Sequence, residues 1–423
     1  MRSAGKRSRG AAVLGTLVLV VTAAIIIAVA GLLLRKNADP GIRVWLLNHQ
    51  PDQALIVNPF NGQVEQKFLV ADGLRELAFN GDYTRAYIAS VVDVANRLKV
   101  LDTRSYLQVD NIEVDGIPQG IGVFPDDKKL AVILGSKTDF MAGGFDVIDL
   151  EERSTSQPHM RKRLYRERGL SLSHKLAVGD DGDRIYVIDA KKPLVNVYSL
   201  REKKFIKSVD LRGAPEEMLY PRQGDSYYVS VLDHLAVYQI SKKTDEIMRA
   251  YVPLAMGPLD PMAIREKIRF IGIDSEANYL FSSALRSQTV YVWQIGNPDH
   301  RVDWGVVART LKTTAFETNE SFQITQEQFL PHTSFKLKGG YNSNLGYVGG
   351  PERLAVDSMD QNLFVVDEDG ALYVYDFNDV VRAKAGSVIE PFHIVMGTEG
   401  EMRDLKVSRP AVAVEKNADG EGS

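Results

Sequence analysis

Residues 118–134 read PQGIGVFPDDKKLAVIL, and this stretch contains the repeating unit of the chain. A short apolar run, GIGVF, leads into the polar segment PDDKK, and a second apolar run, LAVIL, follows it. Short apolar runs separated by acidic and small residues are typical of a tight turn between two β-strands. Related segments stand at 174–184, 215–225 and 351–361, with the letters HKLAVGDDGDR, PEEMLYPRQGD and PERLAVDSMDQ. The stretch therefore predicts a β-rich repeat.

Two further kinds of run, rich in Val, Ile, Tyr and Phe, alternate seven times along the chain and read as strands. The first kind occupies 43–48, 85–90, 129–134, 184–189, 226–231, 278–283 and 362–367, and the second kind 54–59, 98–102, 145–150, 195–200, 235–240, 290–295 and 372–377. The shortest spacings between runs of the first kind, 42 and 44 residues, match the roughly 40–50 residues of a propeller blade. We therefore expect an all-β, seven-bladed β-propeller of four-stranded blades over residues 42–409.

The two ends of this region are expected to meet in one blade. The chain enters at GIRVW (41–45), already in the second strand of blade one, and EMRDLKVSR (401–409) has the pattern of a first strand. A C-terminal strand that completes blade one would protect sheet edges that otherwise invite aggregation. The polar, glycine-containing tail at 410–423 is expected to be disordered.

Two insertions interrupt the repeat. Residues 151–170, EERSTSQPHMRKRLYRERGL, are strongly charged, and residues 308–350 end in the glycine- and asparagine-rich GGYNSNLGYVGG. Loops of this length in a compact fold are usually functional or disordered. We expect the second insertion to be a contact surface for a protein partner.

An uncharged segment of 24 residues, 11–34, precedes the repeat. As a helix it would span roughly 36 Å, enough to cross a bilayer. Four basic residues lie in the tail at 1–10 and two more in the linker at 35–41. The excess on the N-terminal side predicts a cytoplasmic N-terminus and an extracytoplasmic propeller, periplasmic or cell-surface in a bacterium. The alternative is a signal peptide cleaved after Ala28-Val29-Ala30, although its apolar region would be unusually long.

The repeat resembles the YVTN-type propeller family, which is related in shape to WD-repeat blades. The strand of that family reads roughly P-x-G-I-A-V-S-P-D-G, and residues 118–127 follow it; the resemblance covers residues 42–408. No blade carries the literal YVTN tetrapeptide or the Gly-His and Trp-Asp pairs of WD repeats. The resemblance implies the fold. The blades also look like those of propeller lactonases and of the large subunits of some amine dehydrogenases.

One polar column is a candidate ligand-binding site. It lies where the chain enters the first strand of each blade, and its members are Arg75, Gln119, His174, Glu216, Arg269, Glu352 and Arg403. Because the innermost strands of a propeller line its central channel, these residues should surround one mouth of that channel, and a concave opening with convergent polar groups is how small-molecule sites are built. The alternative is that residues in loops entering strands are polar because water surrounds them.

Catalytic, metal and cofactor signals are weak. The chain has no cysteine, and its seven histidines form no HExxH motif. The acidic strings GDDGD (179–183) and DEDG (367–370) stand where hairpin turns are expected and lack the spacing of a calcium loop. We therefore predict no catalytic residue, no metal ligand and no cofactor.

Two functions remain open. The first is a membrane-anchored scaffold that binds protein partners. The second is an extracytoplasmic propeller enzyme, lactonase-like or a dehydrogenase subunit, with its site at the channel mouth; the lactonase resemblance implies Glu216, His174 and Arg269 as acid, base and cation. Outside the six basic residues near the anchor, 45 Lys and Arg stand against 55 Asp and Glu. This acidic balance argues against binding to nucleic acid.

Overall fold

The chain divides into two compact units, Met1–Gly41 and Ile42–Ser423. The computed structural model describes residues 41–408 with interruptions. The interruptions are 50–51, 70–72, 91–95, 137–141, 157–159, 172–174, 190, 233–235, 254–267, 285–287, 302–326, 338–349, 358, 360, 369, 385–386 and 396–400, and the side chains of His49, Arg269 and residues 401–403 also lie outside the description. No helix in the described part is long and apolar enough to cross a bilayer. The predicted anchor at 11–34 and the tail at 410–423 fall outside that part.

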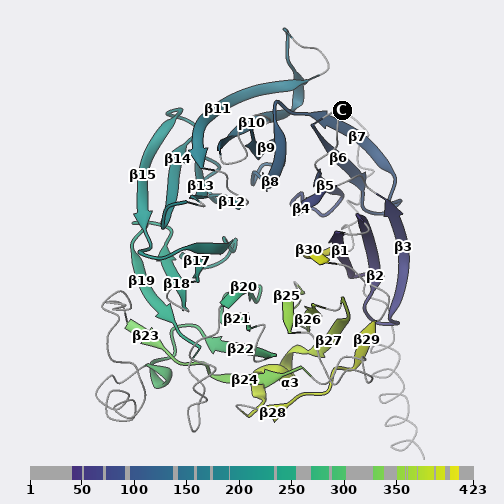
Figure 1. Cartoon of the computed structure of the whole chain (residues 1–423), viewed down its shortest axis with the longest axis vertical. Coiled ribbons are helices and arrows are strands. Elements are labelled where there is room, and N and C mark those ends of the chain that lie inside the picture. Colours follow the sequence, from purple (N-terminus) through teal and green to yellow (C-terminus); the bar gives the residue numbers. More distant parts are fainter. Residues whose placement is uncertain are drawn as a thin grey trace, which may run out of the picture. The chain divides into compact units, whose positions relative to one another are not determined.

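Seven sheets, built mainly from antiparallel pairs, stand around a central axis, as Figure 1 shows in a view down the ring. Each sheet is one blade, and its strands follow from the innermost outward. Blades one to three are β30 (Glu401–Ser408), β1 (Arg43–His49), β2 (Gln53–Asn58), β3 (Gln63–Leu69); β4 (Leu74–Phe79), β5 (Arg85–Ser90), β6 (Arg97–Asp102), β7 (Gln108–Glu113); and β8 (Ile117–Val123), β9 (Lys129–Gly135), β10 (Ala142–Arg153), β11 (Arg161–Ser171).

Blades four to seven continue the series, and blades five and six each have a fifth strand. They are β12 (Leu176–Val178), β13 (Arg184–Asp189), β14 (Leu194–Ser199), β15 (Lys204–Asp210); β16 (Pro215–Leu219), β17 (Ser226–Val231), β18 (Ala236–Ser241), β19 (Ile247–Tyr251), β23 (Glu327–Phe329); β20 (Ile268–Ile273), β21 (Tyr279–Ala284), β22 (Thr289–Gln294), β24 (Thr333–Lys336), β28 (Ser387–Val388); and β25 (Pro351–Val356), β26 (Asn362–Asp367), β27 (Leu372–Asp376), β29 (His393–Val395). The predicted seven-bladed propeller is confirmed, and all fourteen predicted runs lie in the second and third strands of the blades.

The C-terminal strand completes blade one, as predicted. Strand β30 pairs antiparallel with β1, with Leu46 opposite Leu405. The indole Nε1 of Trp45 donates a hydrogen bond of 3.1 Å to Oγ of Ser408, which joins residues more than three hundred and fifty positions apart. Because β1 and β30 come from opposite ends of the repeat region, this pairing closes the ring.

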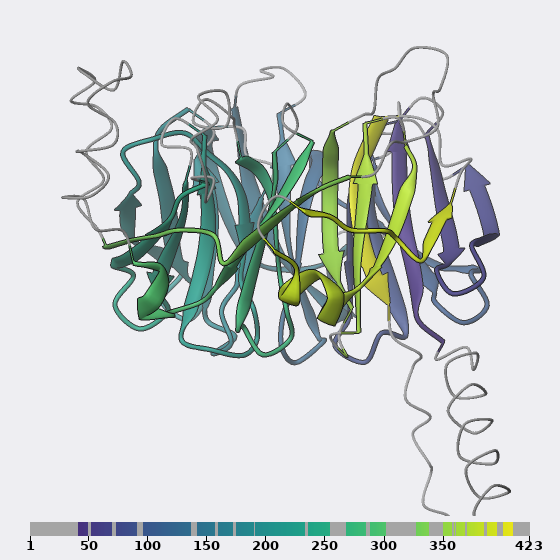
Figure 2. The same ribbon diagram turned by 90° about the horizontal axis from the view of Figure 1, so that it is seen from below.

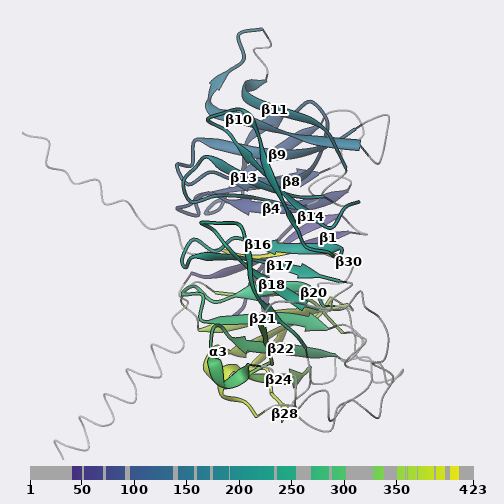
Figure 3. The ribbon, with the colours of Figure 1, turned by 90° about the vertical axis from the view of Figure 1, so that its left-hand side faces the viewer.

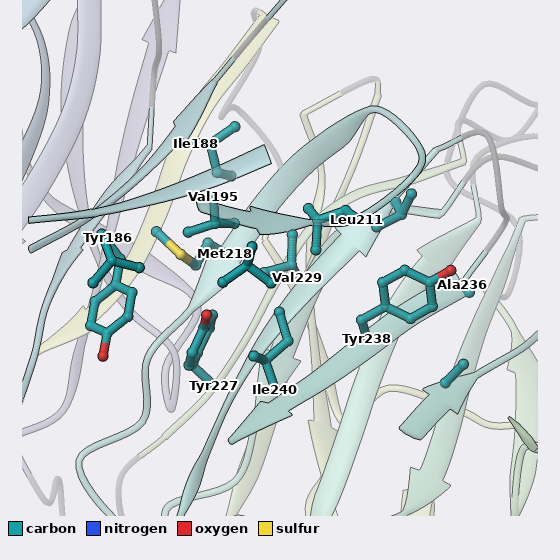
Figure 4. Packing of buried hydrophobic residues seen from close by; sticks show 14 of the residues in the cluster. Tyr186, Ile188, Val195, Leu211, Met218, Tyr227, Val229, Ala236, Tyr238 and Ile240 are labelled. Atoms are coloured by element: carbon teal, nitrogen blue, oxygen red, sulfur yellow. The ribbon is translucent and has the colours of Figure 1, made fainter. Parts of the chain in front are cut away.

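The core of the propeller lies between blades. Seven clusters of buried apolar side chains occur among the described residues, and each joins two neighbouring blades. Figure 4 shows the cluster between blades four and five, where Tyr186 and Val195 face Met218, Tyr227 and Val229. Strand residues alternate between the two faces of a sheet, so each blade buries both faces against its neighbours.

The innermost strands approach one another closely. A Cβ on Gly122 of β8 would lie 2.8 Å from Cδ1 of Leu176 in blade four, and one on Gly272 of β20 would lie 2.4 Å from Cδ1 of Leu354 in blade seven. A larger residue at either position would require the neighbouring leucine side chain to shift. Seen edge-on in Figures 2 and 3, the sheets stand side by side around the ring.

Both predicted insertions contribute strands, which differs from the expectation of long loops. Residues 161–170 belong to β11, the outermost strand of blade three, whose basic residues pair with acids: Arg166 Nε lies 3.0 Å from Oδ1 of Asp146. The segment 308–350 supplies β24, the fourth strand of blade six, and β23, which adds in parallel to β19 of blade five. The remainder of 308–350 lies outside the described residues. Charged residues can form β11 because it is the outermost strand of its blade and most of its side chains are exposed or half-buried. In β24, by contrast, Thr333, Ser334 and Phe335 are buried.

Candidate functional site

Six of the seven innermost strands carry a bulge at the positions of the predicted polar column; β12 of blade four shows none in its described residues. The pairing of the innermost strand with its neighbour shifts register between Leu74 and Glu76 in blade two, and between Pro351 and Arg353 in blade seven. Comparable shifts occur in blades one, three, five and six. A bulge adds one residue to a strand and re-aims the side chains beside it. Strand alternation alone therefore does not predict the direction in which the side chains of the column point.

The structure places the predicted column as follows. Gln119 is buried, and its Oε1 has no hydrogen-bond partner among the described residues. Arg75, Glu216 and Glu352 are half-buried. His174 and the side chains of Arg269 and Arg403 lie outside the described residues. Binding of a ligand by this column remains a prediction.

The residue after each column member belongs to a different and more closely connected set. In order around the ring, this second column is Asp404, Glu76, Gly120, Lys175, Glu217, Phe270 and Arg353. Together with Lys406 it places three carboxylates and three cations on or beside the innermost strands. We call these six charged residues the channel network. Glu76, Glu217 and Asp404 are buried.

Lys175 occupies the centre of the channel network. Its Nζ lies 3.1 Å from Oε1 of Glu76 in blade two and 3.2 Å from Oε1 of Glu217 in blade five. Blade three, which stands between Glu76 and Lys175, has Gly120 at the equivalent position and so places no side chain there. One ammonium group thus links carboxylates from two other blades.

Arg353 continues the network to blade seven. Its Nη1 lies 3.4 Å from Oε2 of Glu217, and its Cζ stands 3.5 Å above the centre of the Phe270 ring in blade six. A guanidinium over an aromatic face is attracted by the ring quadrupole, and more so away from water. Arg353 therefore contacts both of the two blades that precede it in the ring.

Two carboxylates also join adjacent blades through the backbone. Oε2 of Glu76 accepts a hydrogen bond of 2.7 Å from the N–H of Ile121 in blade three. Oδ2 of Asp404 accepts one of 2.9 Å from the N–H of Leu77 in blade two. In each case the carboxylate of one blade binds an amide of the next. Hydrogen bonds to an ionised acceptor are stronger than neutral ones.

The pKa values of Glu76, Asp404 and Lys175 reflect the opposing effects of burial and of the neighbouring charges. Burial, with the Asp404 charge adding to it, raises the pKa of Glu76 above its ordinary value despite the nearby Lys175. Burial would also raise the pKa of Asp404, but Lys406, Lys175 and Arg353 hold it below its ordinary value. For Lys175, burial is outweighed by Glu217 and Glu76, so its pKa is raised and it stays protonated. The network is a coupled set of charges.

Each carboxylate oxygen of the channel network has a partner. Glu76 uses one oxygen for Lys175 and one for Ile121, and Glu217 uses one for Lys175 and one for Arg353. Asp404 uses Oδ1 for Lys406, at 3.7 Å, and Oδ2 for Leu77. A general acid or base must reach a proton on a substrate. Here the acids hold blades together, which is a structural role.

A signal for this second column was present in the sequence. In every blade its member is followed by an aliphatic residue: Leu405, Leu77, Ile121, Leu176, Met218, Ile271 and Leu354. All seven of these are buried between blades. In six of the seven repeats a charged residue or glycine directly precedes this aliphatic residue, and Phe270 takes that place in blade six.

A second candidate surface lies on the outer edge of the ring, where the blades carry exposed apolar side chains. We define the apolar rim by Phe392 and Ile394 of blade seven, Val64 of blade one, and Leu107 and Val109 of blade two. Leu107 is 67% exposed, and the other four are 37–49% exposed. These residues lie in or directly before strands β29, β3 and β7. The three strands follow one another along the right-hand side of the ring in Figure 1.

Blade seven approaches blade one, and blade one contacts blade two, close to the rim. A Cβ on Gly62, in the turn before β3, would lie 3.8 Å from Cγ2 of Val395 at the end of β29. The hydroxyl of Tyr106, just before Leu107, donates a hydrogen bond of 3.4 Å to Oε2 of Glu65. Exposed apolar patches that span several elements often mark interaction sites.

Comparison with known proteins supports the fold and does not identify a family. No family model matches the chain. It is 23% identical to Antigen Lp49 of Leptospira interrogans over 169 residues, which is 39% of this chain and 32% of that protein. The match therefore spans about a third of the curated relative. The resemblance to YVTN-type repeats remains a prediction.

Two solved structures, one of them a β-propeller domain, resemble this chain over most of its length. The β-propeller domain of Cps50 (Swd1) from Myceliophteria thermophila has a TM-score of 0.52 and 11% identity, and covers 77% of this chain and 87% of its own. A functionally unknown protein from Desulfotomaculum acetoxidans DSM 771 has a TM-score of 0.57 and 12% identity, with 87% of this chain and 99% of its own covered. At these identities the likeness shows the fold alone.

The channel network predicts a large effect for Lys175→Met. The substitution leaves Glu76 and Glu217 buried without the cation between them, so the unfolding free energy should fall by about 3–5 kcal/mol. Urea unfolding followed by circular dichroism measures this loss. The matched control is Lys162→Met on β11, whose partner Glu152 is exposed; it should change stability little. Equal midpoints for Lys175→Met and the wild type would contradict the structural role.

Proposed function

We propose that this protein is a membrane-anchored, extracytoplasmic propeller that binds a protein partner through the apolar rim. The observation that carries the proposal is the rim itself, because exposed apolar side chains stand on three successive blades. Removal of apolar side chains from water by a partner stabilises a complex, by roughly 25 cal/mol for each Å² of apolar surface buried. Propellers are stable rings whose outer strands present fixed surfaces, so little ordering would accompany docking.

The state of the channel supports binding over catalysis. The acids of the channel network bind cations and amides of other blades. The lactonase-like alternative would use Glu216, His174 and Arg269, of which only Glu216 has a described side chain. A catalytic site needs convergent groups around one reacting point. The exposed apolar rim favours the scaffold, and hydrolysis of a lactone is tested beside partner binding.

The anchor and the location are proposals from the sequence. The uncharged segment 11–34 and the four basic residues before it are the support. A span of this length and a positive N-terminal flank favour insertion with the N-terminus in the cytoplasm. The rim would then face partners on the far side of the membrane.

Partner binding is tested by substitutions on the rim. Leu107→Asp and Ile394→Asp each place a charge in the surface, and each should weaken capture of a shared partner from solubilised membranes of the host by at least about tenfold. The matched control is Phe205→Asp on β15 of blade four, because Phe205 is 48% exposed and lies outside the rim. The measurement is quantitative mass spectrometry of proteins that co-purify with the tagged full-length chain.

Three results would contradict the proposal that a partner binds through the apolar rim. The first is an unchanged set of partners in both rim variants. The second is an equal loss in Phe205→Asp. The third is a set of observations in which the rim variants keep every partner, the wild-type protein hydrolyses a lactone, and the double variant Arg75→Ala with Glu216→Ala does not. That result would place the function at the channel mouth.

The location is tested separately with protease. Protease added to intact cells or spheroplasts should digest the propeller, because the charge bias places it outside the cytoplasm. A known exported protein and a known cytoplasmic protein in the same cells are the controls. Protection of the propeller while the exported control is digested would show that the proposed orientation is wrong.

A further inference from the structure

Two histidines far apart in the sequence meet at the edge of blade six. His300 ends the 3-10 turn η2 (Pro298–His300), which follows β22, and His332 precedes β24. Nδ1 of His332 lies 3.2 Å from Nε2 of His300, and the ring planes are nearly perpendicular. Both residues are half-buried, so the pair remains accessible from solvent. Their separation of 32 positions hides the pair from a search for local motifs.

The tautomer of His332 is fixed by a third element. Nε2 of His332 lies 3.0 Å from the carbonyl oxygen of Val381, in helix α3 (Phe377–Arg382). A carbonyl oxygen only accepts, so Nε2 carries the hydrogen and donates it. The facing Nδ1 therefore presents a lone pair toward His300. Metal-bound histidines commonly donate their other ring N–H to a backbone carbonyl in this way.

The spacing of the two nitrogens also fits a shared ion. Zinc binds histidine nitrogens at roughly 2.0–2.1 Å with tetrahedral angles, which places two such nitrogens about 3.3 Å apart. The observed 3.2 Å is close to this value. Without an ion, the same distance corresponds to a hydrogen bond from Nε2 of His300 to Nδ1 of His332. An ion would replace that hydrogen, which moves to Nδ1 of His300.

Three segments converge to hold the site. The amide of Leu330 donates to the carbonyl oxygen of His300 at 2.8 Å, and Oγ1 of Thr333 donates to the carbonyl oxygen of Ala383 at 2.7 Å. These bonds flank His332 on both sides and fix its backbone against η2 and the end of α3. The two rings are therefore positioned before any ligand arrives, which reduces the ordering that binding requires.

We propose that His300 and His332 form a binding site for a divalent transition-metal ion, zinc in the first instance. Nδ1 of His332 and Nε2 of His300 are the protein ligands. In the part of the chain that the structure describes, no group of three or more histidines and carboxylates gathers around one point; water completes the coordination in this proposal. Imidazole nitrogens favour zinc, copper and nickel over magnesium and calcium. The bound ion would cross-link η2 and the segment before β24. This site is independent of the proposed rim.

Isothermal titration of the full-length, detergent-solubilised protein with zinc tests the proposal. The protein must carry no histidine tag, and magnesium serves as the control ion. We expect one zinc per chain, with affinity reduced at least about tenfold by His300→Gln and by His332→Gln. The matched control is His393→Gln on β29, which removes a histidine outside the pair and should leave the affinity unchanged.

His300→Gln is the decisive variant, because it leaves the bond between His332 and Val381 in place. A thermal melt without zinc checks that each variant is folded, and zinc should raise the melting temperature of the wild type and of His393→Gln only. The proposal is overturned if the wild type binds no zinc at about 1 mM. It is also overturned if folded His300→Gln binds zinc as tightly as the wild type.

Discussion

The pairing of the buried carboxylates with cations on the innermost strands is the constraint on which the ring depends. Lys175 is half-buried, and Glu76 and Glu217, which are buried, approach it from blades on either side. An ion pair away from water is costly unless each partner is present with good geometry. The six charged residues are therefore paired with one another in only one arrangement of the innermost strands. The apolar clusters between blades supply most of the cohesion, and the charges fix which strands face one another.

Ring closure and the channel network depend on the same strand. Strand β30 pairs with β1 and so completes blade one. It also carries Asp404, whose carboxylate binds the amide of Leu77 in blade two. A single segment from the C-terminal end of the repeat thus connects blade one to its neighbour through both the backbone ladder and a side chain. A ring without this segment would expose two sheet edges and leave the cations of the channel network with fewer partners.

The fold could be predicted from the sequence because period and strand pattern repeat seven times. The turn strings GDDGD and DEDG were also interpreted correctly: Oδ1 of Asp181 accepts from the amide of Asp183, and Oδ1 of Asp367 accepts from that of Ala371. The channel residues could not be predicted from strand alternation, because the bulges displace them by one position from the predicted column. Strand β24 escaped prediction because its sequence lies in a region with a different period. The pair of His300 and His332 depends on tertiary structure alone.

The coupling of blades through the channel is measured most directly by a double-mutant cycle on Glu217 and Arg353. Glu217→Gln, Arg353→Met and the double variant are unfolded in urea beside the wild type, with equal m-values as the condition for comparison. Loss of the Arg353 contact with Phe270 cancels in the cycle, so the remaining term belongs to the pair. A coupling energy of about 0.5–3 kcal/mol is expected for residues in one buried network. Strictly additive effects, within about 0.3 kcal/mol, would mean that these charges do not hold the blades together, and would contradict the structural role of the channel.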